Sequence, residues 1–325
     1  LWCDFWWSWR VFRNLPEADI IICNAVTLPM WLGWLKPKAG KVVVMTGRMP
    51  KGQYKRYSHL ARIFAPSSLV EKRLHDENPA FASIIRVTGY PIAWSLLAQP
   101  QPVPPFLPPR EDPHEVTLGF AGRIHKEKGL LLLADALRIV SQKTDLPPIR
   151  LILCGPSDVQ RGGSGAAFRG RLMNQFSLAV ANTRFHLLDP EFNERSLAAI
   201  FQRLDVFCYP SLAEEGETFG VAVAEAMAAG AVPIVSNLAC FRDFVRDGEN
   251  GFVFDHKAEA AAAQLATVIE RVLRNSEERR LVAATARASV QCFDYPNYAK
   301  MLLDDFNSLL APSSQPEIPS QPTHE

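Results

Sequence analysis

From residue 116 onward, short apolar runs of strand length alternate with longer runs of helix length. The strand-like runs VTLGFAG, IRLILCG and RFHLL are separated by the helix-like runs KGLLLLADALRIVSQ and GRLMNQFSLAVAN. Parallel strands joined by crossover helices form a sheet that is covered on both faces. The sequence therefore predicts a doubly wound α/β domain, and ligands of such domains bind beyond the carboxyl ends of the strands.

The alternation continues to residue 254, and a weaker version of it precedes residue 91. NERSLAAIFQRL and TFGVAVAEAMAAG are typical of helices, whereas DVFCYPS, AVPIVSN and GFVF are typical of strands. Near the start, four runs predict buried strands, namely ADIIICN (18–24), KVVVMTG (41–47), ARIFAPS (61–67) and IIRVTGY (84–90). SSLVEKRLHDEN, between the last two, predicts a helix with a serine N-cap. GGSG at 162–165 has no phosphate-loop context and indicates a flexible loop.

Proline composition suggests where the chain divides. Residues 99–113 hold seven prolines, so this segment can neither pair in a sheet nor continue a helix and is expected to be a stiff linker. The polar, proline-rich segment 311–325 is expected to be a disordered tail. The predicted division is an N-terminal domain (1–98), the linker (99–113), a C-terminal domain (114–293), a C-terminal helix (294–310) and the tail (311–325).

Bulk composition bounds the class of protein. The 325 residues, 48% of them hydrophobic, are enough for two globular domains. Residues 1–110 carry 14 Lys and Arg against 6 Asp and Glu, whereas the remainder carries 21 against 28, so the two halves differ in sign and should have different partners. Six scattered cysteines without a C-x-x-C pair indicate buried, reduced thiols. No apolar run is long enough for a transmembrane helix.

The stretch GFAGRIHKEKG (119–129) places two cations where a predicted strand ends and a helix begins. Gly122 allows a tight turn, and Arg123 and Lys128 follow it. A guanidinium and an ammonium at the carboxyl edge of a parallel sheet suit a diphosphate. The alternative is that both are solvated surface charges, which is the usual place of Lys and Arg.

Two carboxylates stand eight residues apart in EGETFGVAVAEAMAAG. Glu217 precedes the expected helix start at Gly220 and Val221, where free backbone N–H groups and the helix dipole favour an anion. Glu217 could be a simple cap and Glu225 a solvated surface charge. However, Glu225 lies among alanines and valines, so its helix should be largely buried and its carboxylate needs partners. The two hydroxyls of a ribose would supply them.

The same residues resemble a known family. The Glu217-x7-Glu225 spacing, with TFG after the first Glu and EAMAAG around the second, is similar to the E-x7-E signature of retaining GT-B glycosyltransferases of the family-four group. GFAGRIHKEKG, LILCGP, DVFCYPSLAEEGETFG and VPIVSNLACFRDFVRDGENGFVF resemble further segments of that family in the same order. The resemblance covers 116–256, and over 18–98 only the pattern matches. It implies two Rossmann-like domains that face a cleft.

The resemblance also implies roles for individual residues. Glu225 should hold the ribose of a nucleoside-diphosphate sugar, and Glu217 should contact the transferred sugar. The other implied donor contacts are Gly122, Thr218, Phe219, Gly220, Val221 and, in the loop LLDPEF near the base, Asp189. Arg123 and Lys128 should stabilise the leaving diphosphate. The family uses no metal at this site and no cofactor, and the chain has no D-x-D and no ligand-like spacing among its seven histidines.

Two departures from the family pattern raise a second hypothesis. No strand with a glycine-rich loop precedes LWCDFWWSW, and Thr46-Gly47-Arg48 stands where many members have His-Gly. We therefore expect an incomplete N-terminal domain, with Trp2, Trp6, Trp7 and Trp9 covering a sheet whose neighbours are absent or incomplete. The first hypothesis is a retaining hexosyltransferase for cell-surface polysaccharide or glycolipid synthesis. The second is a truncated or degenerate fold that binds a nucleotide sugar without turnover.

A basic cluster in the first domain suggests an anionic partner. Residues 36–73 contain one acid, Glu71, and ten cations: Lys36, Lys38, Lys41, Arg48, Lys51, Lys55, Arg56, Arg62, Lys72 and Arg73. Tyr54 and Tyr57 lie among them as candidate aromatic anchors. A solvated basic face is the alternative, and no nucleic-acid motif accompanies the cluster. We predict a cytoplasmic enzyme at the inner face of a membrane, acting on a lipid-linked or otherwise anionic acceptor.

Overall fold

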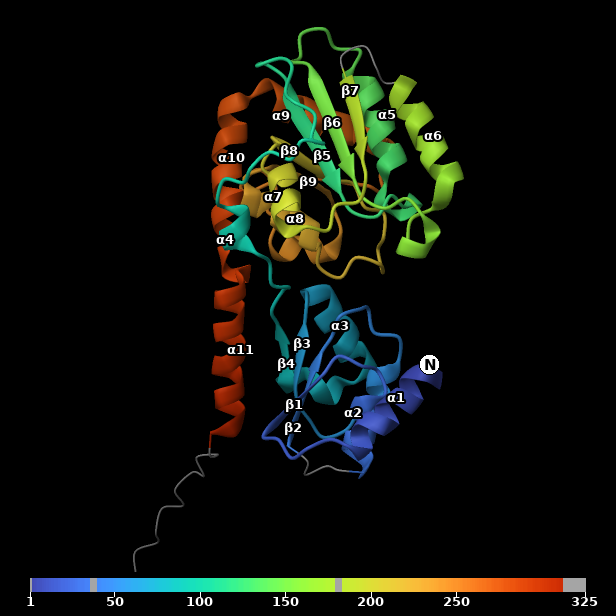
Figure 1. Cartoon of the computed structure of the whole chain (residues 1–325), viewed down its shortest axis with the longest axis vertical. Helices are drawn as coiled ribbons and strands as arrows, with labels where there is room; N and C mark the ends of the chain where they lie inside the picture. The colour runs from blue at the N-terminus through green and yellow to red at the C-terminus, as the bar shows by residue number, and fades with distance from the viewer. Residues whose placement is uncertain (1, 36–39, 179–182, 312–325) are drawn as a thin grey trace, which may run out of the picture.

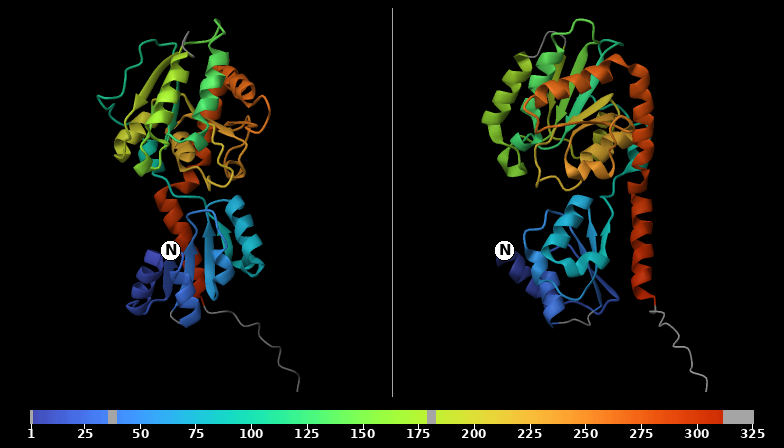
Figure 2. Two further views of the ribbon diagram at one scale, coloured as in Figure 1. Left: turned by 90° about the vertical axis from the view of Figure 1, so that its right-hand side faces the viewer. Right: turned by 180° about the vertical axis from the view of Figure 1, so that it is seen from behind.

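The computed structural model describes residues 2–35, 40–178 and 183–311, and the predicted tail lies outside them apart from Ala311. Two α/β units stand one above the other, and a long C-terminal helix runs beside the lower one (Figures 1 and 2). Each unit has its own parallel sheet and its own buried hydrophobic cluster. The fold class predicted from the strand–helix alternation is therefore confirmed.

The first unit contains a four-stranded parallel sheet in the order β1-β2-β3-β4. Its strands are β1 (Ile20–Cys23), β2 (Lys41–Met45), β3 (Leu60–Ala65) and β4 (Ile85–Val87). Its helices are α1 (Trp2–Arg13), α2 (Leu28–Leu35), η1 (Gln53–Arg56), α3 (Ser68–Glu77) and η2 (Pro79–Ile84). Ser67 caps α3 by accepting the backbone N–H of Val70 at 3.4 Å, which confirms the predicted serine cap.

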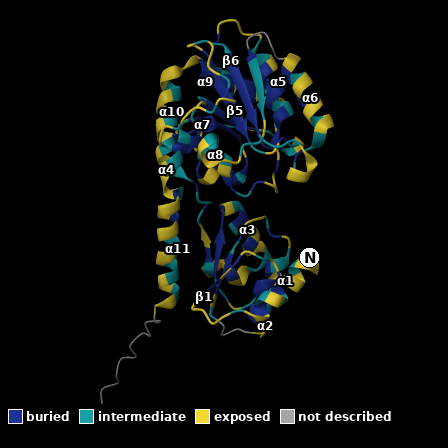
Figure 3. Cartoon of the chain, in the orientation of Figure 1, coloured by how far each residue is buried: buried dark blue, intermediate teal, exposed yellow. Residues whose placement is uncertain are grey.

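The second unit contains a six-stranded parallel sheet in the order β10-β9-β8-β5-β6-β7. Its strands are β5 (Val116–Ala121), β6 (Ile149–Cys154), β7 (Thr183–Leu188), β8 (Val206–Tyr209), β9 (Val232–Ser236) and β10 (Phe252–Phe254). Its helices are η3 (Lys126–Lys128), α5 (Leu130–Val140), η4 (Val159–Arg161), α6 (Gly165–Leu178), α7 (Glu194–Phe201), α8 (Val221–Ala229), η5 (Ala239–Asp243), α9 (Ala261–Arg274), α10 (Ser276–Ser289) and η6 (Gln291–Phe293). Every residue of β5, β6, β8 and β9 is buried, as expected of central parallel strands. Figure 3 shows the buried residues concentrated in the sheets, with exposed residues on the outer helix faces.

The chain crosses between the units earlier than the proline content predicts. Helix α4 (Trp94–Leu97) already packs against α7 and α8 of the second unit, so the crossing lies just after β4. The segment 99–113 rests on the second unit, where Leu107 is buried and the Pro108 carbonyl accepts an N–H of Arg150 at 2.8 Å. Prolines exclude this segment from helix and sheet, as predicted, but contacts rather than composition decide where the units join.

Helix α11 (Tyr295–Leu310) returns the chain to the first unit (Figure 1). Arg62 on β3 donates to Asp305 on α11 at 2.8 Å, and the ring of Phe64 meets Phe306 edge to face. Between the units, the Ser68 backbone N–H and hydroxyl donate to the two carboxylate oxygens of Asp243, at 2.7 and 2.6 Å. The units are therefore joined by polar contacts at the start of α3 and along α11, in addition to the chain crossing.

Helix α1 corrects one expectation about the tryptophans. Trp9 packs against the core of the first unit, but Trp2, Trp6 and Trp7 are 78%, 63% and 53% exposed, so the prediction that they cover a sheet is wrong for these three. Helix α1 packs mainly against α2. In the part of the chain that the structure describes, no helix combines the length and the apolar character needed to cross a bilayer.

Candidate active site

A cavity of about 380 Å³ opens at the carboxyl edge of the second sheet, where ligands of parallel sheets bind. It is formed by the ends of β5 and β6, the loop after β7, and residues of α7 and α8. Its lining residues are Ala121, Gly122, Arg123, Cys154, Gly155, Pro156, Arg161, Pro190, Glu191, Phe192, Leu197, Phe201, Ala222 and Glu225. Two arginines and two glutamates thus stand among mainly apolar neighbours, a composition typical of small-molecule sites.

Glu225 reaches this cavity from a helix that is otherwise packed into the core. On α8, Val223, Ala224, Ala226, Met227 and Ala228 are all buried. Burial raises the pKa of the Glu225 carboxyl to about 7, and the negative charge of Glu194 adds to the effect. The carboxylate therefore gains from any ligand that donates hydrogen bonds to it.

The amino end of α8 lies beside this carboxylate. Gly220 precedes the helix with φ of +101°, a left-handed conformation that glycine adopts without strain. Phe219 is buried, whereas Val221 at the first turn is 36% exposed and Ala222 lines the cavity. The unpaired N–H groups of a first turn attract anions, so the cavity offers an anion site and a hydrogen-bond acceptor one and a half turns apart.

Arg123 stands at the cavity wall but already has partners. Its guanidinium donates to the Gly162 carbonyl at 2.9 Å and to a Glu127 carboxylate oxygen at 2.7 Å. The side chain remains 45% exposed, so nitrogen donors are left for a ligand. The GGSG loop therefore contacts the site: the Ser164 N–H donates to the Ile124 carbonyl at 3.0 Å, whereas the sequence indicated only a flexible loop.

Lys128 and Glu217, predicted to serve the diphosphate and the sugar, are paired with each other. Their side chains are only 7% and 8% exposed, and the Lys128 ammonium donates to Oε1 of Glu217. Tyr209 and Ser211 also donate to Oε1, at 3.1 and 3.2 Å. Three donors converge on one carboxylate oxygen, which fixes Glu217 and leaves Oε2 without a hydrogen bond from any described residue.

Tyr209 and Ser211 were missed by the sequence analysis, which assigned their segment only to strand β8 and its end. Burial raises the pKa of Tyr209 well above its usual value, and the neighbouring Glu217 charge acts in the same direction, so the phenol stays protonated and donates. The only signal in the sequence is that Tyr209 ends an apolar strand and Ser211 follows it, eight and six residues before Glu217.

Part of the loop after β7, which the sequence analysis expected near the base of a donor, lines the cavity. Pro190, Glu191 and Phe192 line the cavity, while Asp189 is exposed and its carbonyl accepts the thiol of Cys154 at 3.4 Å. One carboxylate oxygen of Glu191 accepts the N–H groups of Phe192 and Asn193, at 2.8 and 2.7 Å. Glu191 and Phe192 are therefore candidate contacts for a ligand bound in this cavity.

The segment Thr46-Gly47-Arg48, which differs from the family pattern, faces the second unit. Thr46 follows β2, is buried, and shares a 2.6 Å hydrogen bond with the Tyr54 phenol. Tyr90 donates to the Thr46 carbonyl at 3.4 Å, and its ring meets Phe219 edge to face at 5.9 Å. The end of the first sheet and the TFG segment of the second unit are thus linked through one tyrosine.

The basic cluster is partly at the surface and partly in the core. Lys36 and Lys38 lie outside the described residues, and Arg62 is buried against Asp305. The exposed members are Lys41, Arg48, Lys51, Lys55, Arg56, Lys72 and Arg73. The prediction of aromatic anchors is wrong, because Tyr54 and Tyr57 are 2% and 6% exposed and their phenols bond to Thr46 and to the Val26 carbonyl.

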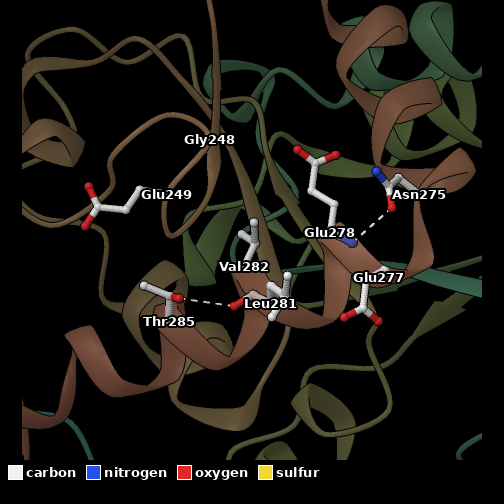
Figure 4. A pocket seen from close by; sticks show the side chains of 8 residues that line it. All are labelled: Gly248, Glu249, Asn275, Glu277, Glu278, Leu281, Val282 and Thr285. Atoms are coloured by element: carbon white, nitrogen blue, oxygen red, sulfur yellow. Dashed lines mark hydrogen bonds between the residues drawn. The ribbon is translucent and has the colours of Figure 1, made fainter.

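A separate hollow on α10 has the wrong charge for a nucleotide. Glu249, Glu277 and Glu278 line it together with Gly248, Asn275, Leu281, Val282 and Thr285 (Figure 4). Glu277 and Glu278 are paired with Arg280 and Arg271. Among the residues that the structure describes, no three His, Cys, Asp or Glu side chains gather as metal ligands.

A family model described as "Glycosyl transferases group 1" matches residues 108–289, which include the whole cavity. The phosphatidyl-myo-inositol mannosyltransferase of Mycobacterium tuberculosis is 27% identical across 94% of the chain and 72% of its own length. The D-inositol 3-phosphate glycosyltransferase of Corynebacterium urealyticum is 26% identical across 63% of the chain and 45% of its own length.

Solved structures agree on the fold. The crystal structure of Anabaena HepE in complex with UDP and glucose superposes with a TM-score of 0.70 at 16% identity, covering 93% of the chain and 81% of HepE. At this identity the likeness concerns the fold alone. The two facing parallel-sheet units are the GT-B arrangement expected from the sequence.

Proposed function

Because the chain belongs to the glycosyl transferases group 1, we propose that it is a retaining hexosyltransferase that takes its sugar from a nucleoside-diphosphate donor. The observation that carries the proposal is the cavity at the carboxyl edge of the second sheet. There Glu225, the first turn of α8 and Arg123 surround one space of about 380 Å³. A nucleoside diphosphate has a diol, a diphosphate and a flat base, and the cavity offers a complement to each.

Each group has a role set by its chemistry. The ionised Glu225 accepts hydrogen bonds from the two ribose hydroxyls, which stabilises a charge that burial disfavours. The diphosphate lies at Val221 and Ala222, where helix N–H groups and Arg123 donate to its oxygens. The base lies toward Glu191 and Phe192, in the loop that also contains Asp189.

Transfer breaks the bond between the anomeric carbon and the phosphate oxygen and forms one to the acceptor oxygen. Negative charge collects on the leaving diphosphate, whose oxygen takes up the proton that the acceptor hydroxyl releases. Arg123 and the α8 amino end stabilise that charge where it develops. Glu217, fixed by Lys128, Tyr209 and Ser211, presents its remaining oxygen to the sugar hydroxyls. The proposal needs neither a metal nor a cofactor.

For the acceptor we propose a phosphate-bearing molecule, lipid-linked in the simplest case, in cell-surface polysaccharide or glycolipid synthesis. The two similar proteins named above are described as acting on phosphatidyl-myo-inositol and on D-inositol 3-phosphate. Exposed cations of the first unit, among them Lys51 and Lys55, suit an anionic acceptor or membrane surface. The proposed location is the cytoplasmic face of a membrane, peripherally bound.

A donor panel tests the proposal. Nucleoside-diphosphate sugars with different bases and sugars are incubated with the protein and a phosphoinositide acceptor, and release of nucleoside diphosphate is measured alongside binding by calorimetry. The proposal requires one donor to bind and turn over, with turnover reduced more than nucleotide binding by Glu217→Gln. Binding without turnover would support a nucleotide-sugar-binding protein instead, and absence of binding would refute both.

A further inference from the structure

Tyr90 occupies the point where the chain leaves the first unit. It follows β4 and Gly89, and it precedes α4, which packs on the second unit. Its phenol donates at 3.4 Å to the carbonyl of Thr46, the residue directly after β2. Its ring meets Phe219 of the second unit edge to face, with 5.9 Å between centroids and 72° between planes. One side chain therefore contacts both units.

The Tyr90 phenol interacts with Thr46 of the first unit and Thr218 of the second. Thr46 shares a 2.6 Å hydrogen bond with the Tyr54 phenol inside the first unit. On the other side, burial raises the pKa of the Tyr90 phenol, and the nearby Thr218 side chain acts in the opposite direction. Tyr54, with its pKa raised to about 12 by burial, is neutral as well. Both phenols are therefore uncharged at physiological pH and can donate hydrogen bonds.

The backbone just before Tyr90 packs closely on aromatic rings, with no space for a side chain at Gly89. Gly89 has φ of +70°, and a side chain there would stand 2.5 Å from Phe293 and 3.1 Å from Phe219. Phe219 is only 1% exposed, because Phe244 and Phe293 pack on it at 4.8 and 5.1 Å between centroids. Phe219 directly precedes Gly220, where α8 and the proposed diphosphate site begin. Gly89 and Tyr90 thus pack directly on the donor loop 217–220 through Phe219.

We propose that Tyr90 is a positioning residue for sugar transfer, which sets the spacing between the first-unit loop 46–48 and the donor loop 217–220. The transferred sugar must occupy the space between these loops, beyond the diphosphate and next to Glu217. Tyr90 then governs how tightly the sugar is held and has little influence on the nucleotide. This inference rests on the proposed function, because it assigns a role within the same site.

The test compares Tyr90→Phe with wild type, using the donor that the panel selects and the matching nucleoside diphosphate. Tyr90→Phe keeps the ring on Phe219 and removes only the hydroxyl. We expect the Kd of the nucleoside diphosphate to change less than about twofold. The Kd of the nucleotide sugar should rise about fivefold, and kcat should fall about tenfold, because losing one neutral hydrogen bond within the protein loosens the loops that hold the transferred sugar.

Tyr57→Phe is the matched control. It also deletes one phenol hydrogen bond, which Tyr57 donates to the Val26 carbonyl at 2.6 Å, but both residues belong to the first unit. A merely structural role for Tyr90 would lower the melting temperature in both variants and leave the affinity ratio of nucleotide sugar to nucleotide at its wild-type value, and that result would overturn the inference. A double-mutant cycle with Thr218→Val must show non-additive effects on kcat, whereas additive effects would overturn it. If wild type bound no nucleoside diphosphate at all, the proposed function itself would fail first.

Discussion

Lys128 and Glu217 form a buried ion pair that joins the 3-10 turn after β5 to the loop before α8. The Lys128 ammonium also stands 5.2 Å from the centre of the Tyr209 ring, whose hydroxyl donates to the same Glu217 oxygen. In the ligand-free protein the two charges satisfy each other. A donor would therefore find Glu217 already oriented, with a single oxygen left for the sugar.

The pair predicts a specific pattern of stability changes. Lys128→Met or Glu217→Gln alone leaves a buried group without its partner and should lower the free energy of unfolding by about 3–5 kcal/mol. The double variant should lose much less than the sum, because neither charge remains. Urea unfolding at pH 7 measures this, with Lys300→Met in the exposed pair with Asp304 as a control that should change stability by less than about 0.5 kcal/mol. Additive losses would show that the pair is not coupled.

Glu225 predicts a pH dependence of stability. Its pKa in the folded protein is about 7, above the ordinary value of 4.5, so the folded state binds a proton more tightly than the unfolded state. Glu225 therefore leaves the free energy of unfolding unchanged below pH 4.5. Its effect lowers that free energy as pH rises from 4.5 to 7, by a total on the order of 3 kcal/mol above pH 7. Glu225→Gln should remove this fall, so the variant should be more stable than wild type at pH 8 and similar at pH 4.5. Equal stability curves from pH 4.5 to 8 would contradict the assignment.

Arg123 predicts discrimination between phosphorylated and free nucleosides. Because its guanidinium faces the proposed diphosphate position, Arg123→Ala should weaken nucleoside diphosphate binding by roughly 10-fold or more, in line with loss of a charge-assisted hydrogen bond. Binding of the free nucleoside should change little. Calorimetry with both ligands measures the difference, and Arg161→Ala at the cavity rim serves as a comparison. Equal losses for nucleoside and diphosphate would place Arg123 away from the phosphates.

The exposed cations of the first unit predict salt-sensitive binding to anionic membranes. Each Lys or Arg near such a surface contributes up to about 1 kcal/mol, so Lys51→Glu with Lys55→Glu should shift most of the protein from the pellet to the supernatant in co-sedimentation. The matched control reverses two exposed arginines of the second unit, Arg169 and Arg171 on α6, and should leave binding unchanged. Vesicle binding that does not depend on the salt concentration, or no binding to anionic vesicles at low salt, would contradict this prediction and favour a soluble acceptor.

Much of the fold is readable from the sequence because the central strands are buried on both faces. Such strands appear as continuous apolar runs, so the predicted runs at 116–122 and 149–155 contain β5 and β6 almost to the residue. Helix α3 is readable for a different reason, since its serine cap is local. Helix α1 was not predicted, because a run dense in tryptophan has no cap and no clear apolar stripe.

The features that were not predicted depend on the direction in which a side chain points and on contacts between distant segments. Tyr54 and Tyr57 stand among lysines and arginines in sequence, yet the 3-10 turn η1 directs both rings into the core. Tyr209 and Ser211 reach Glu217 only because β8 ends beneath the loop before α8. The crossing between units follows the packing of α4, a short helix without a distinctive sequence. The strand or helix to which a residue belongs was therefore often predictable, whereas its contacts with residues distant in the sequence were not.

The central claim is that Glu225 holds the ribose of a nucleoside diphosphate. Its most direct test is calorimetric titration at pH 8 of wild type and Glu225→Gln, each with the nucleoside diphosphate chosen by the panel and with its 2′,3′-dideoxy analogue. We predict that wild type binds the natural ligand about 10- to 100-fold more tightly than the variant, the range for hydrogen bonds to a charged group. Wild type should lose a similar factor with the dideoxy analogue, and the variant should barely distinguish the two ligands. Equal binding by both proteins, or losses that simply add, would contradict the account.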